Sequence, residues 1–364
     1  METFTVAFTK TFPKISIEGG GMKTIKDIAR ISGYSIGTVS RVINNRADVS
    51  EKARKKIKAV IRENDYQPNT NARMLKQNMS SDVCIIVRGN KNIFLESILE
   101  EIQIRMREHG ESINVQFIGE TDNEVDAAIQ LGQNLKPKGI IFMGGNAHTF
   151  KDDFFKITVP CVLVTVDAEE LGYDNLSSFT TDDEEAAGYA VSKLIEKGHR
   201  RIGILGGYPE NQNYESKGGN SALRIKGAVE ELEKNGIRFD FDKDYEPCAF
   251  SSESGYEAAR KLLLKSPDLT GIFAISDLIA IGAMRVFKDM DLGVPEDVSV
   301  VGFDGVNLAE YSIPRLATIR QDAETLARKI VDDLLLRISY NSHAVHEKIP
   351  YAYVDGESIA PPRK

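Results

Sequence analysis

This 364-residue sequence lacks the residues that several kinds of site or segment require. It contains no tryptophan, and its three cysteines, Cys84, Cys161 and Cys248, are too far apart to form a metal-binding or redox motif. A sparse, odd set of cysteines is typical of a reducing cytosol, so we expect a cytoplasmic protein. No apolar run approaches the roughly 18 residues that span a bilayer, and we expect no membrane as a partner.

Motifs of catalysis are also missing. The sequence has no Walker loop, nucleophile elbow or zinc-protease motif. His343 and His346 are three positions apart, but no third ligand follows at a useful spacing. We therefore expect a protein that is not an enzyme and that has no metal and no cofactor.

The charged residues are unevenly distributed. The formal net charge of the chain is -8, yet residues 22–80 hold 13 basic and 5 acidic side chains, a net charge of +8. Residues 1–21 hold two of each, whereas residues 81–364 hold 31 basic and 47 acidic side chains, a net charge of -16. A small basic unit before a large acidic one predicts that only the first unit binds a polyanion.

Residues 1–21 do not resemble a signal peptide, because no basic start is followed by an apolar block. Their Thr and Gly content and their lack of a helical period predict disorder. A Glu-Gly-Gly-Gly run precedes Met22, and its codons could form a ribosome-binding sequence. We expect this segment to be disordered, or to be an extension upstream of a true start at Met22.

Three short amphipathic segments follow. Thr24 is the predicted N-cap of the first helix, and Gly33 is its predicted C-terminal stop. Ser35 begins a second helix, and Ser50 begins a third whose outer face is almost entirely lysine and arginine. Three short helices with a tight turn between the first two predict a helix-turn-helix DNA-binding unit. The alternative is an ordinary three-helix bundle with a solvated basic face.

The segment from Thr24 to Lys76 resembles the DNA-binding headpiece of the lactose-repressor family of bacterial regulators. The resemblance continues in the family's order through "EKGHRRIGILGG", "ISDLIAIGAMR", "GVPEDVSVVGFD", "RLATIRQD" and "IAPP". It implies an α/β protein with an N-terminal helix-turn-helix headpiece and a two-lobed core with parallel sheets, like a periplasmic binding protein. The implied boundaries are 22–67 for the headpiece, 68–80 for a hinge helix or linker, and 81–364 for the effector-binding and dimerisation core. Within the core, lobe 1 comprises about 81–178 and 323–343, and lobe 2 about 179–320 and 344–364.

The resemblance places the second helix in the major groove of DNA, with Ile36, Gly37 and Arg41 at the positions that reach base edges. Arginine can donate two hydrogen bonds to guanine, whereas Ile36 can only contact a thymine methyl group or exclude a base by its shape. Gly37 departs from many relatives, and it either leaves its base pair unread or lets the backbone approach closely. Further DNA contacts are expected at Thr24, Ser35, Thr38, Ser40, Asn44, Ser50, Tyr66 and Asn69, of which Thr24, Ser40, Ser50 and Asn69 would bind phosphates.

The segment 66–78 has two readings. Pro68 blocks continuation of the third helix, and Asn69 can cap a short new one. The resemblance implies a hinge helix that orders on operator DNA, with Leu75 inserted between base pairs in the minor groove and Ala72 allowing close approach. From the residues alone, a plain linker with one stray leucine is an equal alternative, because short helices are marginal in water.

Residues 81–364 alternate short β-rich runs with segments of helical period, which predicts parallel-sheet lobes with helices on both faces. Ligands of such sheets bind at the carboxyl ends of the strands. Arg224 and Asp304 match the effector-binding arginine and aspartate of the family, while Ser276 replaces a common asparagine and Thr165 replaces a common aspartate. The candidate effector-binding residues are Arg88, Phe94, Thr165, Arg224, Ser276, Asp277, Asp304 and Gln321.

Two of these candidates bear on the kind of effector. Arg88 and Arg224 are expected to face one cleft, and Asp304 can neutralise only one of them. The unpaired charge favours a carbohydrate with an acid group, because arginine matches carboxylates and phosphates well. A neutral sugar is the alternative, in which Arg88 forms a salt bridge, for example across the lobes.

The sequence thus predicts a DNA-binding repressor of carbohydrate-use genes. Its partners would be a pseudo-palindromic double-stranded operator, a small carbohydrate-type effector bound between the lobes, and a second copy of the chain in a homodimer. Two alternatives are a small-molecule binding protein and an architectural DNA binder without effector control.

Overall fold

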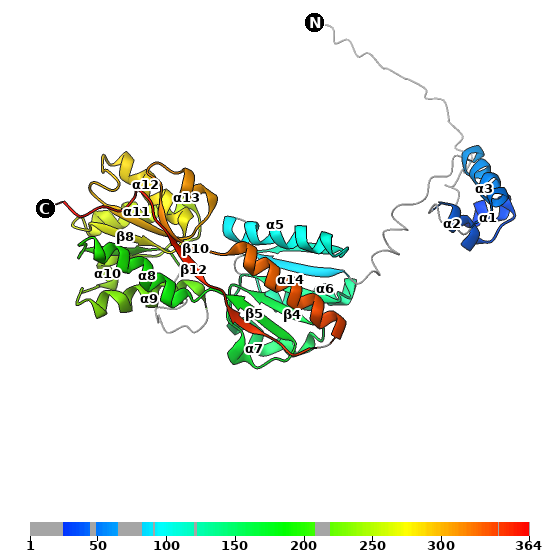
Figure 1. Cartoon of the computed structure of the whole chain (residues 1–364), viewed down its shortest axis with the longest axis horizontal. Coiled ribbons are helices and arrows are strands. Elements are labelled where there is room, and N and C mark those ends of the chain that lie inside the picture. Colours follow the sequence, from blue (N-terminus) through cyan, green and yellow to red (C-terminus); the bar gives the residue numbers. More distant parts are fainter. Residues whose placement is uncertain are drawn as a thin grey trace, which may run out of the picture. The chain divides into compact units, whose positions relative to one another are not determined.

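The structure is a computed structural model, and it divides into two compact units, residues 1–80 and 81–364 (Figure 1). The residues that it describes are 25–43, 49–64, 82–89, 92–119, 122–207, 219–340 and 342–363. The expectations for residues 1–21 and for the hinge segment therefore lie outside the described residues.

The first unit contains the three predicted helices, α1 (Ile25–Ser32), α2 (Ile36–Ile43) and α3 (Glu51–Glu63). Gly33 ends α1 with a φ of 72°, in the left-handed region that favours glycine. Ser35 and Ser50 cap α2 and α3, because their hydroxyl oxygens accept hydrogen bonds from Thr38 N–H at 3.1 Å and Ala53 N–H at 3.4 Å. The three helices share a small core of the buried residues Ile28, Ala29, Val39, Val42, Ala53, Ile57 and Val60.

Lobe 1 of the second unit is built around a parallel sheet with the strand order β11-β5-β4-β3-β1-β2. Its strands are β1 (Val83–Arg88), β2 (Ile113–Ile118), β3 (Gly139–Met143), β4 (Cys161–Val164), β5 (Leu176–Thr180) and β11 (His346–Lys348). Its helices are α5 (Ile93–Glu108), α6 (Glu124–Leu135), α7 (Phe150–Asp153) and α14 (Ala323–Tyr340), with short 3-10 turns at Ala147–Thr149, Phe154–Lys156 and Glu169–Leu171. α5 and α14 pack on one face of the sheet, while α6 and α7 pack on the other, so both faces are buried.

Lobe 2 repeats this design with the strand order β12-β10-β9-β8-β6-β7, in which β10 and β12 pair antiparallel and the other neighbouring strands pair parallel. Its strands are β6 (Ile202–Leu205), β7 (Tyr245–Glu246), β8 (Gly271–Ala274), β9 (Ser299–Asp304), β10 (Ala317–Gln321) and β12 (Tyr351–Val354). Its helices are α8 (Asp183–Glu196), α9 (Asn220–Lys234), α10 (Phe241–Asp244), α11 (Ser252–Lys265), α12 (Asp277–Asp289) and α13 (Asn307–Tyr311). The predicted α/β fold class with parallel sheets is confirmed.

The described chain passes between the lobes after β5, after β10 and after β11. The second passage falls at 321–323, where it was expected, but the other two come later than predicted. β5 stays in lobe 1 through Thr180. β11 pairs with β5 there, and Ile349 is buried in the lobe 1 core. The assignment of residues 344–364 to lobe 2 was therefore wrong for its first residues, because a short edge strand continues the lobe 1 sheet.

No helix in the described ranges is both long and apolar enough to cross a membrane.

Candidate functional site

The headpiece presents part of the predicted DNA-contacting surface. The side chains of Ser35 and Arg41 and the backbone at Gly37 are exposed, and Ser50 is exposed at the start of α3. Thr38 is half-buried, with its hydroxyl 2.9 Å from that of Ser35. The side chains of Ile36 and Ser40 are outside what the structure describes, as are the residues Thr24, Asn44, Tyr66, Asn69, Ala72 and Leu75.

A basic surface accompanies these residues on α3. Lys52, Lys55, Lys56, Lys58 and Arg62 are exposed on this helix. The ammonium group of Lys56 lies 5.7 Å from the centre of the Tyr34 ring, which links α3 to the turn between α1 and α2. Such a surface suits the phosphate backbone of a nucleic acid.

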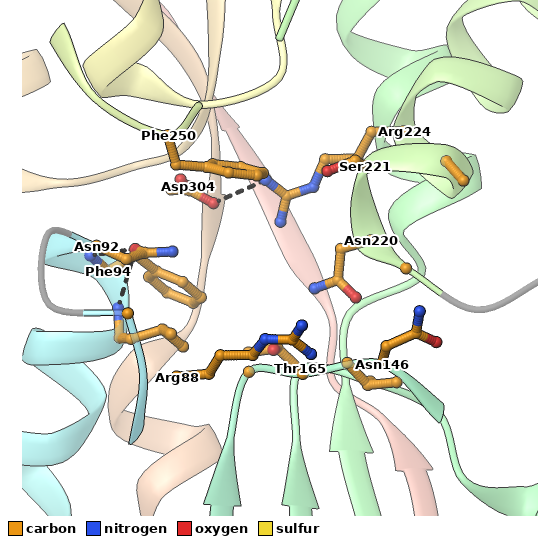
Figure 2. Close-up of a pocket in the computed structure, with 17 residues that line it drawn as sticks. Arg88, Asn92, Phe94, Asn146, Thr165, Asn220, Ser221, Arg224, Phe250 and Asp304 are labelled. Atoms are coloured by element: carbon orange, nitrogen blue, oxygen red, sulfur yellow. Dashed lines mark hydrogen bonds and ion pairs between the residues drawn. The ribbon is translucent and has the colours of Figure 1, made fainter. Parts of the chain in front are cut away.

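The core contains a pocket of about 290 Å³ whose walls come from both lobes. Lobe 1 contributes Arg88, Phe94 and Thr165, and lobe 2 contributes Arg224 and Asp304, as Figure 2 shows. The structure thus brings together five of the eight predicted effector-binding residues. They meet because parallel strands end at the same edge of each sheet, and the two edges face each other.

On the lobe 2 side, Arg224 is held tightly and is only 3% exposed. Its Nε donates to Asp183 Oδ1 at 2.7 Å, and its Nη1 donates to Asp304 Oδ1 at 3.1 Å and to the Ile275 carbonyl oxygen at 2.7 Å. The guanidinium carbon also lies 3.8 Å from the centre of the Phe303 ring. These contacts fix the guanidinium group and leave it with two carboxylate partners.

Asp304 is the acidic member of this wall. It ends β9 with a φ of 106°, a rare conformation for a residue with a side chain. Its Oδ1 also accepts a hydrogen bond from Gln321 Nε2 at 2.9 Å. Burial raises the pKa of Asp304 to about 6, although the Arg224 charge opposes this rise.

On the lobe 1 side, Arg88 forms a salt bridge, as the alternative of a neutral sugar expected, but its partner is a carboxylate of its own lobe. Its Nη1 lies 3.4 Å from Oε2 of Glu124, whose side chain is 1% exposed. Glu124 begins α6 in the same lobe, so the pair does not bridge the lobes. The expectation of a second uncompensated cation in the pocket was therefore wrong, because the helix after β2 brings a buried carboxylate beneath Arg88.

Comparisons with known proteins match both units of the chain. Residues 24–69 match the family described as bacterial regulatory proteins, lacI family, and residues 191–359 match the periplasmic binding protein-like domain. The chain is 34% identical over 340 residues to the HTH-type transcriptional regulator MalR of Clostridium butyricum, a match that covers 92% of this chain and 98% of that one. This chain belongs to the LacI family. It is a transcriptional regulator rather than an enzyme, as its relatives are, and the resemblance seen in its motifs is confirmed.

Other LacI-family relatives agree with this assignment. Catabolite control protein A of Priestia megaterium is 31% identical, with 82% of this chain and 87% of that protein covered. The solved complex of the transcriptional regulator CelR with cellobiose has a TM-score of 0.66 and 26% identity, and covers 92% of this chain and 99% of that one. The lac repressor dimer bound to operator and an anti-inducer has a TM-score of 0.69 and 26% identity, and covers 93% and 100%.

Within the LacI-family core, three predicted site residues do not line this pocket. The hydroxyl of Ser276 is used to cap α12, where it accepts a hydrogen bond from Ile279 N–H. Asp277 is fully buried and accepts hydrogen bonds from the Thr318 hydroxyl at 2.6 Å and from Val306 N–H at 2.8 Å. Gln321 lines a neighbouring cavity together with Phe94 and Asp304, and its Nε2 donates a hydrogen bond to Asp304 Oδ1. Direct effector contacts by these three residues stay a prediction, although capping and buried hydrogen bonds already engage polar atoms of each side chain.

The structure adds pocket residues that the sequence reading missed. They are mainly small amides and hydroxyls: Asn92, Asn146, Asn220 and Ser221, together with the aromatic Phe250. Asn92 and Asn146 also cap the helical turns that begin beside the pocket, and Asn220 and Ser221 begin α9 (Figure 2). An asparagine at a helix start directly after a strand was the available signal, because such a cap lies at the carboxyl edge of the sheet.

Proposed function

We propose that this LacI-family chain is a cytoplasmic repressor of carbohydrate-use genes. In this proposal a homodimer binds a pseudo-palindromic operator, and a small carbohydrate-type effector bound between the core lobes changes its operator affinity. The observation that carries the proposal is the interlobe pocket, which combines hydroxyl-binding side chains with two aromatic walls in a chain that also has a basic headpiece.

The composition of the pocket suits a sugar. Amide side chains at Asn92, Asn146 and Asn220 can both donate and accept hydrogen bonds, as hydroxyl groups require. Phe94 and Phe250 provide apolar surface for the carbon-bound hydrogens of a sugar ring. The solved relative CelR binds cellobiose, and further relatives include a ribose operon repressor of Haemophilus influenzae at 29% identity, with 87% of this chain and 92% of that protein covered. These likenesses support a carbohydrate effector without naming it.

The position of the pocket offers a route for control. A ligand that contacts both lobes favours the arrangement of the lobes in which those contacts form. The affinity for the operator then changes only if the two arrangements of the lobes bind DNA with different affinity. Operator binding must in turn change the affinity for the effector by the same factor. Thr181 and Asp322, in passages between the lobes, are the places where such a rearrangement would concentrate.

Dimerisation follows from the form of the operator. One headpiece reads one half-site, so a palindromic operator needs a two-fold pair of chains. The lac repressor, a relative of solved structure, binds its operator as a dimer. Sedimentation at micromolar concentration should give a dimer, and a stable monomer or tetramer would contradict this part of the proposal.

The proposal that the headpiece binds a specific operator is tested most sharply by substituting Arg41, the residue expected to recognise a base. Arg41→Ala should weaken operator binding by about 1–3 kcal/mol and relax the preference at one base pair in each half-site. The matched control Lys55→Ala, on the basic face of α3, should weaken binding to all sequences alike and flatten its salt dependence. A binding-selection experiment with random DNA compares the two variants. An unchanged preferred sequence for Arg41→Ala would show that another residue reads the base.

The two alternatives make different predictions. A small-molecule binding protein would bind a sugar but protect no discrete DNA site. An architectural DNA binder would coat DNA with little sequence preference and would not respond to any metabolite. Footprinting with and without candidate sugars separates all three functions, because only the proposed repressor shows one protected palindrome whose occupancy a sugar changes.

A further inference from the structure

The charges around the interlobe pocket are balanced within the protein. Among the described lining residues, the charged ones are Arg88, Arg224 and Asp304. Two more carboxylates contact the arginines from behind the pocket wall, with Glu124 against Arg88 and Asp183 against Arg224. Two cations are therefore matched by three carboxylates, so this part of the pocket offers no excess of positive charge to a ligand.

Glu124 is more than a counter-ion for Arg88. Its Oε1 accepts hydrogen bonds from Asn146 N–H at 3.0 Å and from the Thr149 hydroxyl at 2.8 Å, while Oε2 faces Arg88. The backbone at Gly145 passes so close that an added Cβ would lie 2.3 Å from Oε1. One buried carboxylate thus holds both Arg88 and the turn that presents Asn146 to the pocket.

We propose that Glu124 is a specificity-determining residue that acts through Arg88, so that the pocket selects an uncharged carbohydrate over its anionic counterpart. This inference rests on the proposed carbohydrate effector and specifies its class. A carboxylate or phosphate next to Arg88 would have to share one guanidinium group with Glu124, and the two like charges repel each other in a partly desolvated site. A hydroxyl group instead accepts a hydrogen bond from Arg88 without disturbing the ion pair.

The lobe 2 wall of the pocket does not attract an anion either. The carboxylates of Asp183 and Asp304 both pair with the guanidinium group of Arg224, which also donates a hydrogen bond to the Ile275 carbonyl oxygen. An anion near that wall would meet the Asp304 carboxylate first. Both walls therefore disfavour a negative ligand, and the lobe 1 wall does so through a single buried residue.

The test uses the full chain and matched sugars. Calorimetry compares a panel of neutral mono- and disaccharides with the corresponding acids and phosphates, for example glucose with glucuronate and glucose 6-phosphate, and maltose with maltose 6′-phosphate. The wild-type protein should bind a neutral member of the panel at least about tenfold more tightly than its anionic counterpart. The affinity for the neutral sugar should not change with salt concentration, since no net charge is neutralised on binding.

The variant Glu124→Gln removes the counter-charge and keeps the shape. The ratio of anionic to neutral affinity should rise about tenfold or more, because an anion then no longer competes with the Glu124 carboxylate for the Arg88 guanidinium group. The control Glu108→Gln changes the net charge of the chain equally at an exposed position of lobe 1, and it should leave the ratio unchanged. A purely structural role of Glu124 would weaken both classes of ligand alike and leave their ratio as in the wild type.

The outcomes separate this inference from the proposed function. Tighter binding of an anionic sugar than of its neutral counterpart by the wild type would overturn the inference, while the carbohydrate-controlled repressor would stand. An unchanged ratio in a folded Glu124→Gln variant would also overturn it. If no member of the panel binds, the carbohydrate effector fails and the inference fails with it. If the variant does not fold, the wild-type comparison still tests the selection itself: tighter binding of the neutral sugar supports it, and tighter binding of the anionic counterpart overturns it.

Discussion

The two walls of the interlobe pocket each contain an arginine, but the arginines are held very differently. Arg224 in lobe 2 is 3% exposed and is fixed by two carboxylates, a carbonyl oxygen and an aromatic ring. Arg88 in lobe 1 is 19% exposed and pairs with the carboxylate of Glu124. The difference shows that an arginine beside the pocket is not by that alone a ligand-binding residue, because its partners within the protein decide how it can act.

The two arrangements imply different functions. The guanidinium group of Arg224 is enclosed by the protein, and its main effect is to hold the Asp304 carboxylate at the pocket surface. Arg88 reaches the pocket with its charge already compensated, so it can contribute a hydrogen bond but little net attraction for an anion. We therefore expect lobe 2 to provide the rigid part of the site and lobe 1 to determine which charge the site accepts.

The largest expected effect comes from the more buried arginine. Arg224→Leu would leave Asp183 and Asp304 buried without their cation, and breaking a buried pair in this way costs about 3–5 kcal/mol. The free energy of unfolding, measured with urea, should fall by that amount, and effector binding should be lost. A loss below about 1 kcal/mol would mean that the two walls are held equally loosely and would contradict the comparison.

Arg88→Leu should have a smaller effect on stability. Glu124 loses its cation but keeps the hydrogen bonds from Asn146 N–H and the Thr149 hydroxyl, so we expect a loss of about 1–3 kcal/mol. The double variant Arg88→Leu with Glu124→Gln should be more stable than Arg88→Leu alone, because no unpaired buried charge remains. Urea denaturation of the two single variants and the double variant measures this coupling. Additive losses would show that the two side chains do not form a functional pair.

The smallest expected effect is a dependence on pH from Asp304. Because burial raises its folded-state pKa to about 6, this residue contributes stability that is present below its ordinary pKa and is lost as the pH rises through about 6. Effector binding should show the opposite trend, since protonation below about pH 6 removes the charged acceptor that faces the pocket. Calorimetry between pH 7.5 and pH 5 should show a loss of affinity on the order of tenfold. The Asp304→Asn variant should bind more weakly and without this dependence, whereas a flat wild-type profile would place the ionisation elsewhere.

Much of the fold was predictable from local patterns. The apolar runs that became β1, β3 and β4 are buried on both faces of a sheet, and this burial makes them visible as continuous hydrophobic segments. β11, with the sequence His-Glu-Lys, was not predictable in this way. It is a short edge strand that is placed by its pairing with β5, and a polar edge strand has no apolar signal of its own.

Of the site residues, those at the end of a strand could be assigned from the sequence, because the strand itself places such a side chain at the pocket edge. Asp304 ends β9 and Arg88 ends β1, so both could be assigned to the pocket edge. Glu124 could not be assigned, because an acidic residue in the first turn of a helix ordinarily stabilises that helix from the surface. Its burial depends on Arg88 and on the turn after β3, which are distant in sequence. The positions of Ser276 and Asp277 outside this pocket were not predictable for the same reason, since helix capping and buried hydrogen bonds depend on the folded neighbours.

The most direct test of the account is the effect of an effector on operator binding by the full chain. Fluorescence anisotropy with a labelled pseudo-palindromic operator should be measured with and without the neutral sugar that calorimetry shows to bind best. We predict that this sugar changes the operator affinity of the wild type by about 5–150-fold, the usual range of allosteric coupling, and that Arg224→Leu abolishes the change. A sugar that binds in the pocket but leaves operator affinity unchanged would contradict the account.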